Sequence, residues 1–175
     1  MLDQGLVSIF TGDGKGKTTA AVGSAVRASG HGLRVFIVFF MKGENYAHGE
    51  VKALSQLANV TTASFGQRGW VDRANVKPEH RERAGSALAA ASEAVKSGSY
   101  DLVVLDEITI AINYGLISLD EVLKLINNKP RGVELILTGR NADPGLIEVA
   151  DLVTEMVMVK HPYTRGIKAR PGIEY

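Results

Sequence analysis

The chain has 175 residues, of which 45% are hydrophobic and 22% are charged, a length and composition that fit one folded domain. Its 20 Lys and Arg residues against 19 Asp and Glu leave a net charge of +1, so no overall positive charge favours nucleic acid or an anionic membrane as a partner. The absence of cysteine excludes disulfides, thiolate metal sites and cysteine nucleophiles. Neither a signal peptide nor an apolar run long enough to span a bilayer is found, so we expect a cytoplasmic protein without a membrane partner.

Short β-rich runs alternate with helical patterns along the chain. Strands are predicted over Leu6–Thr11, Arg34–Phe40, Val60–Phe65, Tyr100–Asp106, Val133–Thr138 and Leu152–Val159. Most of these runs are continuously apolar, which is typical of strands covered on both faces. Helices are predicted over Thr18–Ser29, Gly49–Ala58, Pro78–Ser97, Ser118–Ile126 and Asp143–Ala150. The alternation predicts one α/β domain over residues 1–175, with a mainly parallel sheet of about six strands and helices on both faces.

The segment IFTGDGKGKTTAA, Ile9–Ala21, places a glycine-rich loop between a predicted strand and a predicted helix. It nearly matches the phosphate loop G-x-x-x-x-G-K-[ST], but Thr11 stands where the first glycine should be. In such loops the backbone N–H groups and the helix N-terminus bind phosphate oxygens, the lysine neutralises charge and the threonine can ligate Mg²⁺. We therefore predict a P-loop NTPase-like three-layer sandwich, rather than a glycine-rich turn with incidental lysines. The predicted ATP-binding residues are Gly12, Asp13, Gly14, Lys15, Gly16, Lys17, Thr18 and Thr19.

Two further polar motifs follow predicted buried strands. Both are expected at the carboxyl edge of the sheet, where open α/β folds bind ligands. In LVVLDE, Asp106 and Glu107 predict a carboxylate that holds a metal ion directly or through water, although acidic residues also start many helices without such a role. In LTGR, Arg140 either clamps phosphate oxygens with its planar guanidinium or is simply solvated.

Cationic residues gather in the C-terminal tail, where five lie within eleven residues: Lys160, His161, Arg165, Lys168 and Arg170. In a nearly neutral chain this favours an ordered anion-binding loop over residues 160–175, contributing to the active site, over a solvated tail. The only tryptophan, Trp70, lies in a polar loop next to Gly69, where a large ring is hard to bury. No spacing among the four histidines indicates a metal site, and His80 is expected on the exposed side of its helix.

Several motifs occur in an order that is typical of one enzyme family: GDGKGKTT, MKGE at Met41–Glu44, VVLDEITIAINYGLIS, LTGR and VKHPYTRGIKARPGIEY. Over Gly5–Tyr175 the chain resembles the ATP:cob(I)alamin (corrinoid) adenosyltransferases of the phosphate-loop type. The resemblance implies that a modified loop holds ATP in reverse orientation compared with ordinary phosphate-loop enzymes. It also implies that the Co(I) of a reduced corrinoid (cobalamin or cobinamide) attacks the 5′ carbon of the ribose, forms a cobalt–carbon bond and releases tripolyphosphate.

The resemblance also implies roles for individual residues. Co(I) is itself a strong nucleophile, so the protein has to place the reactants and stabilise the charge of the departing triphosphate. Lys17, Glu107 and Arg140 are the predicted catalytic residues. Mg²⁺ or Mn²⁺ is expected with ATP, held by Thr18, Asp106 and Glu107, with Glu107 as a direct ligand. Trp70 is the predicted corrinoid contact, pressing on the lower face of the ring to displace the axial base. Some members have F-x-W in this loop, but here Val71 and Asp72 follow Trp70.

Partners also follow from the resemblance: an electron donor, either a reductase or a flavoprotein, and a second copy of the chain in a homodimer. Some members carry an N-terminal arm that covers the site of the partner subunit. Only Met1–Gln4 precede the first matching residue here, so we expect that cover to be absent or built differently. Two alternatives stay open. An ordinary phosphate-loop ATPase or nucleoside kinase would release ADP, and the Asp106–Glu107 pair fits it too. A non-catalytic carrier would bind ATP or corrinoid without forming a cobalt–carbon bond.

Overall fold

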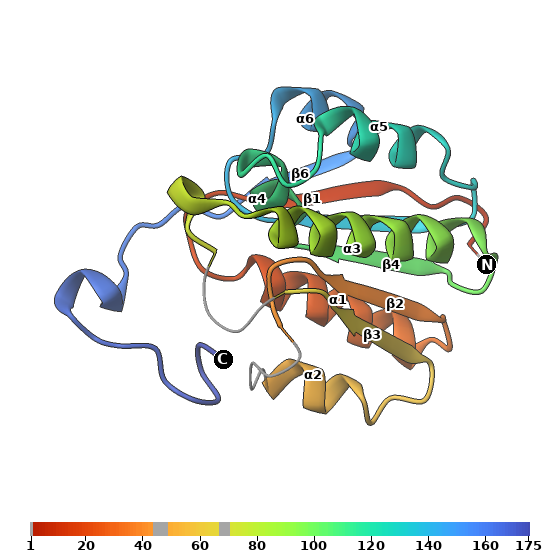
Figure 1. Cartoon of the computed structure of the whole chain (residues 1–175). Helices are drawn as coiled ribbons and strands as arrows, with labels where there is room; N and C mark the ends of the chain where they lie inside the picture. Colours follow the sequence, from red (N-terminus) through yellow and green to blue (C-terminus); the bar gives the residue numbers. More distant parts are fainter. Residues whose placement is uncertain (1, 44–48, 67–70) are drawn as a thin grey trace.

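Six parallel strands form the centre of the molecule (Figure 1). The structure is a computed structural model that describes residues 2–43, 49–66 and 71–175. The strands are β1 (Val7–Thr11), β2 (Val35–Phe39), β3 (Val60–Ser64), β4 (Leu102–Asp106), β5 (Glu134–Thr138) and β6 (Leu152–Glu155). Their order in the sheet is β3-β2-β4-β5-β1-β6, and each pair of neighbours is parallel. The predicted α/β sandwich with a parallel sheet of about six strands is therefore confirmed.

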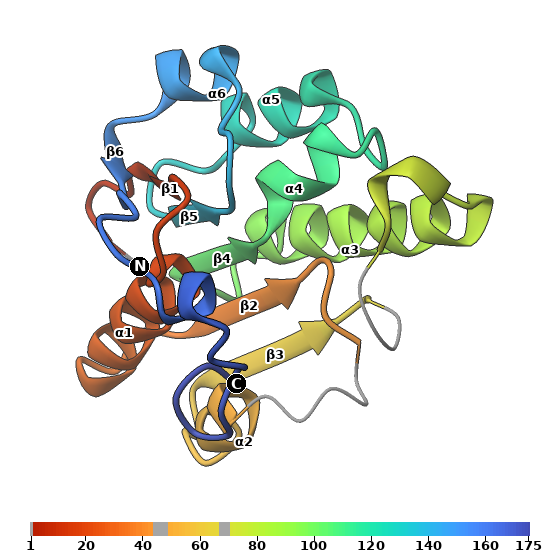
Figure 2. The ribbon, with the colours of Figure 1, turned by 90° about the vertical axis from the view of Figure 1, so that its left-hand side faces the viewer.

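Helices cover both faces of this sheet, as Figure 2 shows from one end of the strands. The α-helices are α1 (Lys17–Gly30), α2 (Gly49–Leu54), α3 (Pro78–Lys96), α4 (Ile108–Asn113), α5 (Leu119–Asn127) and α6 (Pro144–Val149). Two short 3₁₀ turns, η1 (Arg73–Asn75) and η2 (Pro162–Arg165), lie in the connections. No helix in these described ranges is long and apolar enough to cross a membrane.

The two-residue period of the strands sorts their side chains between the two helical layers. On β2, Val35, Ile37 and Phe39 join the apolar cluster beneath α1 and α2. Phe36 and Val38 join the opposite cluster, to which α3, α4, α5 and α6 contribute. Both faces of the central strands are thus buried, which explains why these strands read as continuous apolar runs.

The edge strand β6 differs from this pattern. Leu152 is 47% and Val153 is 39% exposed, so this strand, unlike the central ones, is not covered on both faces. The strand also ends at Glu155, four residues earlier than predicted. Here the chain turns toward the glycine-rich loop, where Met156 donates its N–H to the Thr11 carbonyl at 2.8 Å. Hydrophobicity alone does not reveal that a strand lies at the edge of its sheet.

Two local features were not predicted correctly. Helix α4 has the sequence ITIAIN, whose β-branched residues have low helix propensity. It forms where Ile108 and Ala111 are fully buried, so tertiary burial outweighs local preference. His80 is 6% exposed, which contradicts its expected exposure. Its Nδ1 accepts the N–H of Lys77 at 3.1 Å, so the imidazole caps the start of α3.

Candidate active site

The strand order brings the separate motifs together at the carboxyl edge of the sheet. Strand β5 lies between β1 and β4, so its polar end, Thr138–Arg140, separates the glycine-rich loop after β1 from the Asp106–Glu107 pair after β4. Strand β2 lies beside β4 and is followed by Lys42. The predicted ligand edge therefore carries groups from four strands, and the C-terminal tail lies at the same end of the molecule (Figure 1).

The glycine-rich loop is packed against the backbone that follows β6. Gly12 and Gly16 have φ values of 93° and 123°, a region that side chains disfavour. A Cβ atom on Gly14 would lie 2.6 Å from the Met156 carbonyl oxygen, and the Gly14 N–H donates to that oxygen at 2.6 Å. The loop is thus packed against Met156, and the Gly14 N–H already has a protein partner.

Lys17, the first residue of α1, points its side chain back into this loop. Its ammonium donates to the carbonyl oxygens of Gly12 and Gly14, each at 2.7 Å, and the residue is buried. Burial and the Arg140 guanidinium lower the pKa of Lys17. The Glu107 carboxylate raises it, but the net change is downward. The ammonium is therefore positioned beside the loop N–H groups, where phosphate oxygens would enter.

Asp106 and Thr138 form a buried polar pair between β4 and β5. The Thr138 hydroxyl donates to Asp106 Oδ1 at 2.7 Å and accepts the N–H of Glu107 at 2.9 Å. Both side chains are almost completely buried, at 1% and 0% exposure. Thr138 therefore fixes the direction of the carboxylate and the start of the backbone turn that follows it.

The second carboxylate oxygen of Asp106 faces a cation. Oδ2 is buried and has no aligned hydrogen-bond donor within the described residues, but the Lys42 ammonium forms an ion pair with it at 2.9 Å. The same ammonium lies 3.4 Å from Thr18 Oγ1. Burial lowers the pKa of Lys42, but the carboxylates of Asp106, Glu50 and Glu107 outweigh this effect, so that the net change raises it.

Glu107 is held in an unusual backbone conformation. Its φ is 63°, in the left-handed region that non-glycine residues rarely adopt. A Cβ on Gly139 would lie 3.3 Å from Glu107 Oε2 and would collide with the Thr109 hydroxyl, so the glycine of LTGR leaves room for this carboxylate. Burial and the Asp106 carboxylate raise the pKa of Glu107. The Lys42, Lys17 and Arg140 cations lower it, but the net change is upward.

These groups fit a divalent cation that arrives with a phosphorylated ligand. No cluster of three or more His, Cys, Asp or Glu side chains suited to a metal occurs among the residues that the structure describes. Mg²⁺ usually takes only one or two carboxylates and completes its shell with substrate phosphates and water. Such a partial set is formed by Asp106 Oδ2, Glu107 and the Thr18 hydroxyl. Because Asp106 Oδ2 accepts no hydrogen bond within the described residues, it is suited to bind a cation.

Arg140 and Lys15 differ from the buried groups because both are exposed. The Arg140 backbone is fixed, since its carbonyl accepts from the Thr109 hydroxyl at 2.7 Å and from Asn113 at 3.0 Å. Its side chain projects from this anchored turn, and both of its predicted roles stay open. Asp13 and Thr19 are exposed as well.

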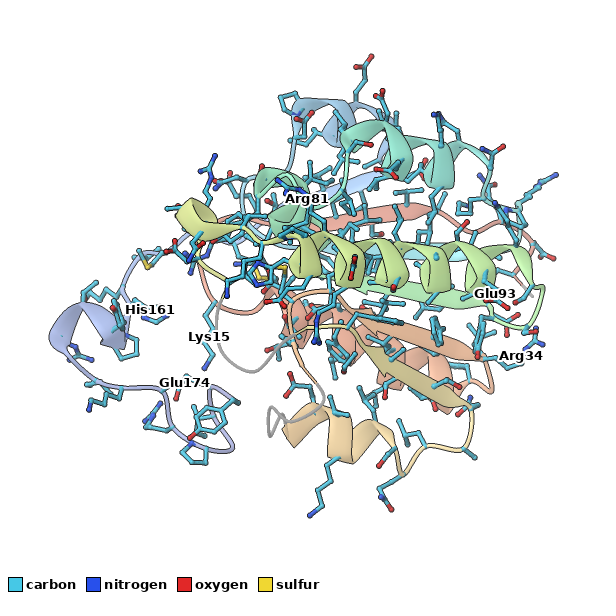
Figure 3. The ribbon with its side chains drawn as sticks, viewed as in Figure 1. Lys15, Arg34, Arg81, Glu93, His161 and Glu174 are labelled. Carbon is cyan, nitrogen blue, oxygen red and sulfur yellow. The ribbon has the colours of Figure 1, made fainter. Side chains whose placement is uncertain are left out.

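The C-terminal tail contacts the glycine-rich loop through Lys15. The Lys15 ammonium donates to the Ile173 carbonyl at 2.9 Å and pairs with Glu174 at 3.1 Å, and Figure 3 shows the two side chains pointing toward one another. Hydrogen bonds from the Arg170 side chain and backbone, with a further contribution from Lys15, lower the pKa of Glu174 to about 2. This end of the tail thus contacts the loop, and the anion-binding role of residues 160–175 stays a prediction.

Several members of the site carried no specific role in the sequence analysis. Lys42, Thr138 and Gly139 lie within the motifs MKGE and LTGR, and Met156 lies within the predicted strand Leu152–Val159. Their shared signal is position, because each follows or ends a strand at the carboxyl edge. The predicted corrinoid contact Trp70 lies outside the described residues, as does Glu44 of the MKGE motif.

Comparison with known proteins decides the family. The model of the family described as ATP:corrinoid adenosyltransferase BtuR/CobO/CobP matches residues 3–175. The chain belongs to this family. The corrinoid adenosyltransferase of Pseudomonas aeruginosa is 36% identical, in an alignment that covers 99% of this chain and 85% of the relative. The corrinoid adenosyltransferase of Escherichia coli K12 is also 36% identical, with 99% and 87% covered, and that of a Sinorhizobium species is 38% identical, with 99% and 81% covered.

Among solved structures, a KaiC-like protein of Pyrococcus horikoshii superposes with a TM-score of 0.59 at 19% identity, covering 88% of this chain and 74% of that one. At this identity the similarity concerns the fold alone, and it confirms the predicted P-loop NTPase-like architecture. The adenosyltransferase family match includes the glycine-rich loop, the Asp106–Glu107 turn and the C-terminal tail, so the resemblance inferred from the motifs is confirmed.

Proposed function

We propose that this member of the adenosyltransferase family transfers the 5′-deoxyadenosyl group of ATP to the Co(I) of a reduced corrinoid and releases tripolyphosphate. The observation that carries the proposal is the family match over residues 3–175, which includes the altered glycine-rich loop. The relatives from Pseudomonas aeruginosa and Escherichia coli K12, which are named corrinoid adenosyltransferases, align with 99% of this chain. The alternative of an ordinary ATPase or nucleoside kinase has no comparable support.

The triphosphate of ATP would bind in the glycine-rich loop. The N-terminus of α1 and the loop N–H groups offer donors, except for the Gly14 N–H, which is already bonded to Met156. The buried Lys17 ammonium adds a full positive charge. When phosphate binds, Lys17 exchanges the carbonyl oxygens of Gly12 and Gly14 for phosphate oxygens. Because the leaving group is a polyanion, donors fixed in advance stabilise its developing charge. Arg140 can add a second positive charge at the exposed rim.

Thr18, Asp106 and Glu107 would hold Mg²⁺ or Mn²⁺ that enters with ATP. The metal ion, when bound, neutralises part of the triphosphate charge. Thr138 keeps Asp106 directed at this position through its 2.7 Å hydrogen bond, and Gly139 leaves space for Glu107. The protein needs no general base for this reaction, because a reduced cobalt atom is itself the nucleophile.

The corrinoid side of the site is proposed from the family resemblance. Trp70 is the predicted contact with the lower face of the corrin, and the described end of its loop is anchored by Arg83, which donates to the Gly66 carbonyl at 2.8 Å. The C-terminal tail, folded against Lys15, would border the nucleotide. A homodimer and a separate electron donor are carried over from the resemblance in the same way. The cytoplasmic location expected from the sequence stays a prediction.

An anaerobic assay tests the proposal directly. Purified protein is mixed with MgATP and chemically reduced cob(I)alamin, and the visible spectrum is followed while the phosphate products are separated. The proposal expects the adenosylcobalamin spectrum to grow together with tripolyphosphate. Accumulation of ADP and phosphate without corrinoid, and no cobalt–carbon bond, would instead support the ATPase or kinase alternative.

A further inference from the structure

Lys42 occupies the position that the metal ion is expected to take. Its ammonium lies 2.9 Å from Asp106 Oδ2 and 3.4 Å from Thr18 Oγ1, and these two oxygens belong to the proposed metal ligands. The Lys42 side chain is only 18% exposed. The Lys42 ammonium therefore pairs with the same Asp106 oxygen that the proposed metal ion would use.

The backbone of Lys42 is fixed by its neighbours, whereas its long side chain can adopt other rotamers. The Lys42 carbonyl accepts the N–H of Gly66 at 3.0 Å, and a Cβ on Gly66 would collide with the Lys42 backbone. A lysine ammonium at the end of a four-carbon stem can change partners without a backbone change. Glu50, at the start of α2, offers a second carboxylate 3.6 Å from the ammonium.

We propose that Lys42 is a built-in cation that holds Thr18 and Asp106 in place until a divalent metal ion bound to a nucleoside triphosphate displaces it. The ammonium then swings toward Glu50 and the incoming phosphates. This inference rests on the metal site of the proposed function, since it assigns Lys42 the same oxygens. Its physical basis is that two cations cannot share one buried carboxylate oxygen without strong repulsion.

The competition can be measured without catalysis. Mn²⁺ binding to the nucleotide-free and corrinoid-free protein is followed by the loss of the EPR signal of free Mn²⁺. Lys42→Met removes the competing charge while keeping the length of the side chain. This variant should bind Mn²⁺ more tightly by a factor of about ten at least, and tenfold corresponds to about 1.4 kcal/mol. Lys42→Gln repeats the measurement with a polar neutral side chain, and circular dichroism checks that each variant is folded.

Two control variants separate charge from packing. Lys42→Arg keeps the positive charge and should not gain Mn²⁺ affinity. Lys52→Met removes one positive charge from the exposed side of α2 and should leave Mn²⁺ affinity within about twofold of the wild type, because exposed charges are screened. Equal Mn²⁺ affinity for the wild type and both neutral Lys42 variants would overturn the proposal. A gain in Lys42→Arg as large as in Lys42→Met would overturn it too.

Asp106→Asn distinguishes this inference from the function on which it rests. If the metal binds at Asp106, the gain caused by Lys42→Met should disappear in the double variant Lys42→Met, Asp106→Asn. A gain that persists there would place the Mn²⁺ elsewhere and refute both the Lys42 displacement and the metal assignment. The adenosylation assay of the wild type is independent of these results, so adenosylcobalamin formation together with unchanged Mn²⁺ affinity would refute the Lys42 inference alone.

Discussion

The hydroxyl of Thr138 connects the two acidic residues of the site, and its removal should be costly. Thr138→Val keeps the shape of the side chain but deletes the donor to Asp106 Oδ1 and the acceptor for the Glu107 N–H, which lie at 2.7 and 2.9 Å. A hydrogen bond to a charged group contributes about 1.5–3 kcal/mol, and an unsatisfied buried N–H costs about 1–3 kcal/mol. Because Thr138 is 0% exposed, water cannot replace either bond, and we expect a loss of about 3–5 kcal/mol in the free energy of unfolding.

Urea denaturation followed by circular dichroism measures this loss. Thr61→Val is the matched control, since Thr61 lies on β3 with its side chain exposed, and surface changes of this kind usually alter stability by less than about 0.5 kcal/mol. The same Thr138 variant should also require more Mg²⁺ for half-maximal adenosylation, because Asp106 is no longer directed. If Thr138→Val lowers the free energy of unfolding no more than Thr61→Val does, the hydrogen bonds of Thr138 do not stabilise the site, and the reasoning is refuted.

Three further changes test other parts of the structure. Lys17→Met should lower kcat/KM by about 10²–10³-fold, the scale expected for loss of one fixed donor to a developing charge. Its far-ultraviolet circular dichroism spectrum should be unchanged, and near-normal turnover would show that Lys17 has no role in the reaction. Glu107→Gln should shift the Mg²⁺ titration of activity to higher concentration, and an unchanged curve would assign the metal to Asp106 alone. Asp101→Asn should lower the free energy of unfolding at pH 7 by about 1–3 kcal/mol, because buried Asp101 accepts the Arg34 backbone N–H at 2.8 Å and two side-chain hydrogen bonds from its guanidinium. Hydrogen bonds from Arg34 hold the pKa of Asp101 far below its ordinary 3.8. The contribution of Asp101 to stability is therefore complete above pH 3.8 and is lost as the pH falls toward the lower folded-state pKa. Urea titrations should show a smaller difference in unfolding free energy between wild type and variant at pH 3 than at pH 7, and an equal difference would contradict the ion pair.

The sequence by itself determined the features that depend on neighbouring residues. The loop from Gly12 to Thr18 could be recognised because glycine, lysine and threonine at fixed spacing between a strand and a helix specify a local backbone path. The parallel sheet followed from continuous apolar runs alternating with helices. The family resemblance also came from contiguous motifs, and the match over residues 3–175 confirmed it.

Only the tertiary structure decided which distant residues meet. Lys42, Thr18 and Asp106 follow or end different strands, and their convergence depends on the order in which those strands pair. No local spacing contains that order, because it is set by the burial of the whole sheet between its two helical layers. For the same reason Thr138 between the acidic residues, the burial of His80 and the exposure of β6 could not be read from the residues around them.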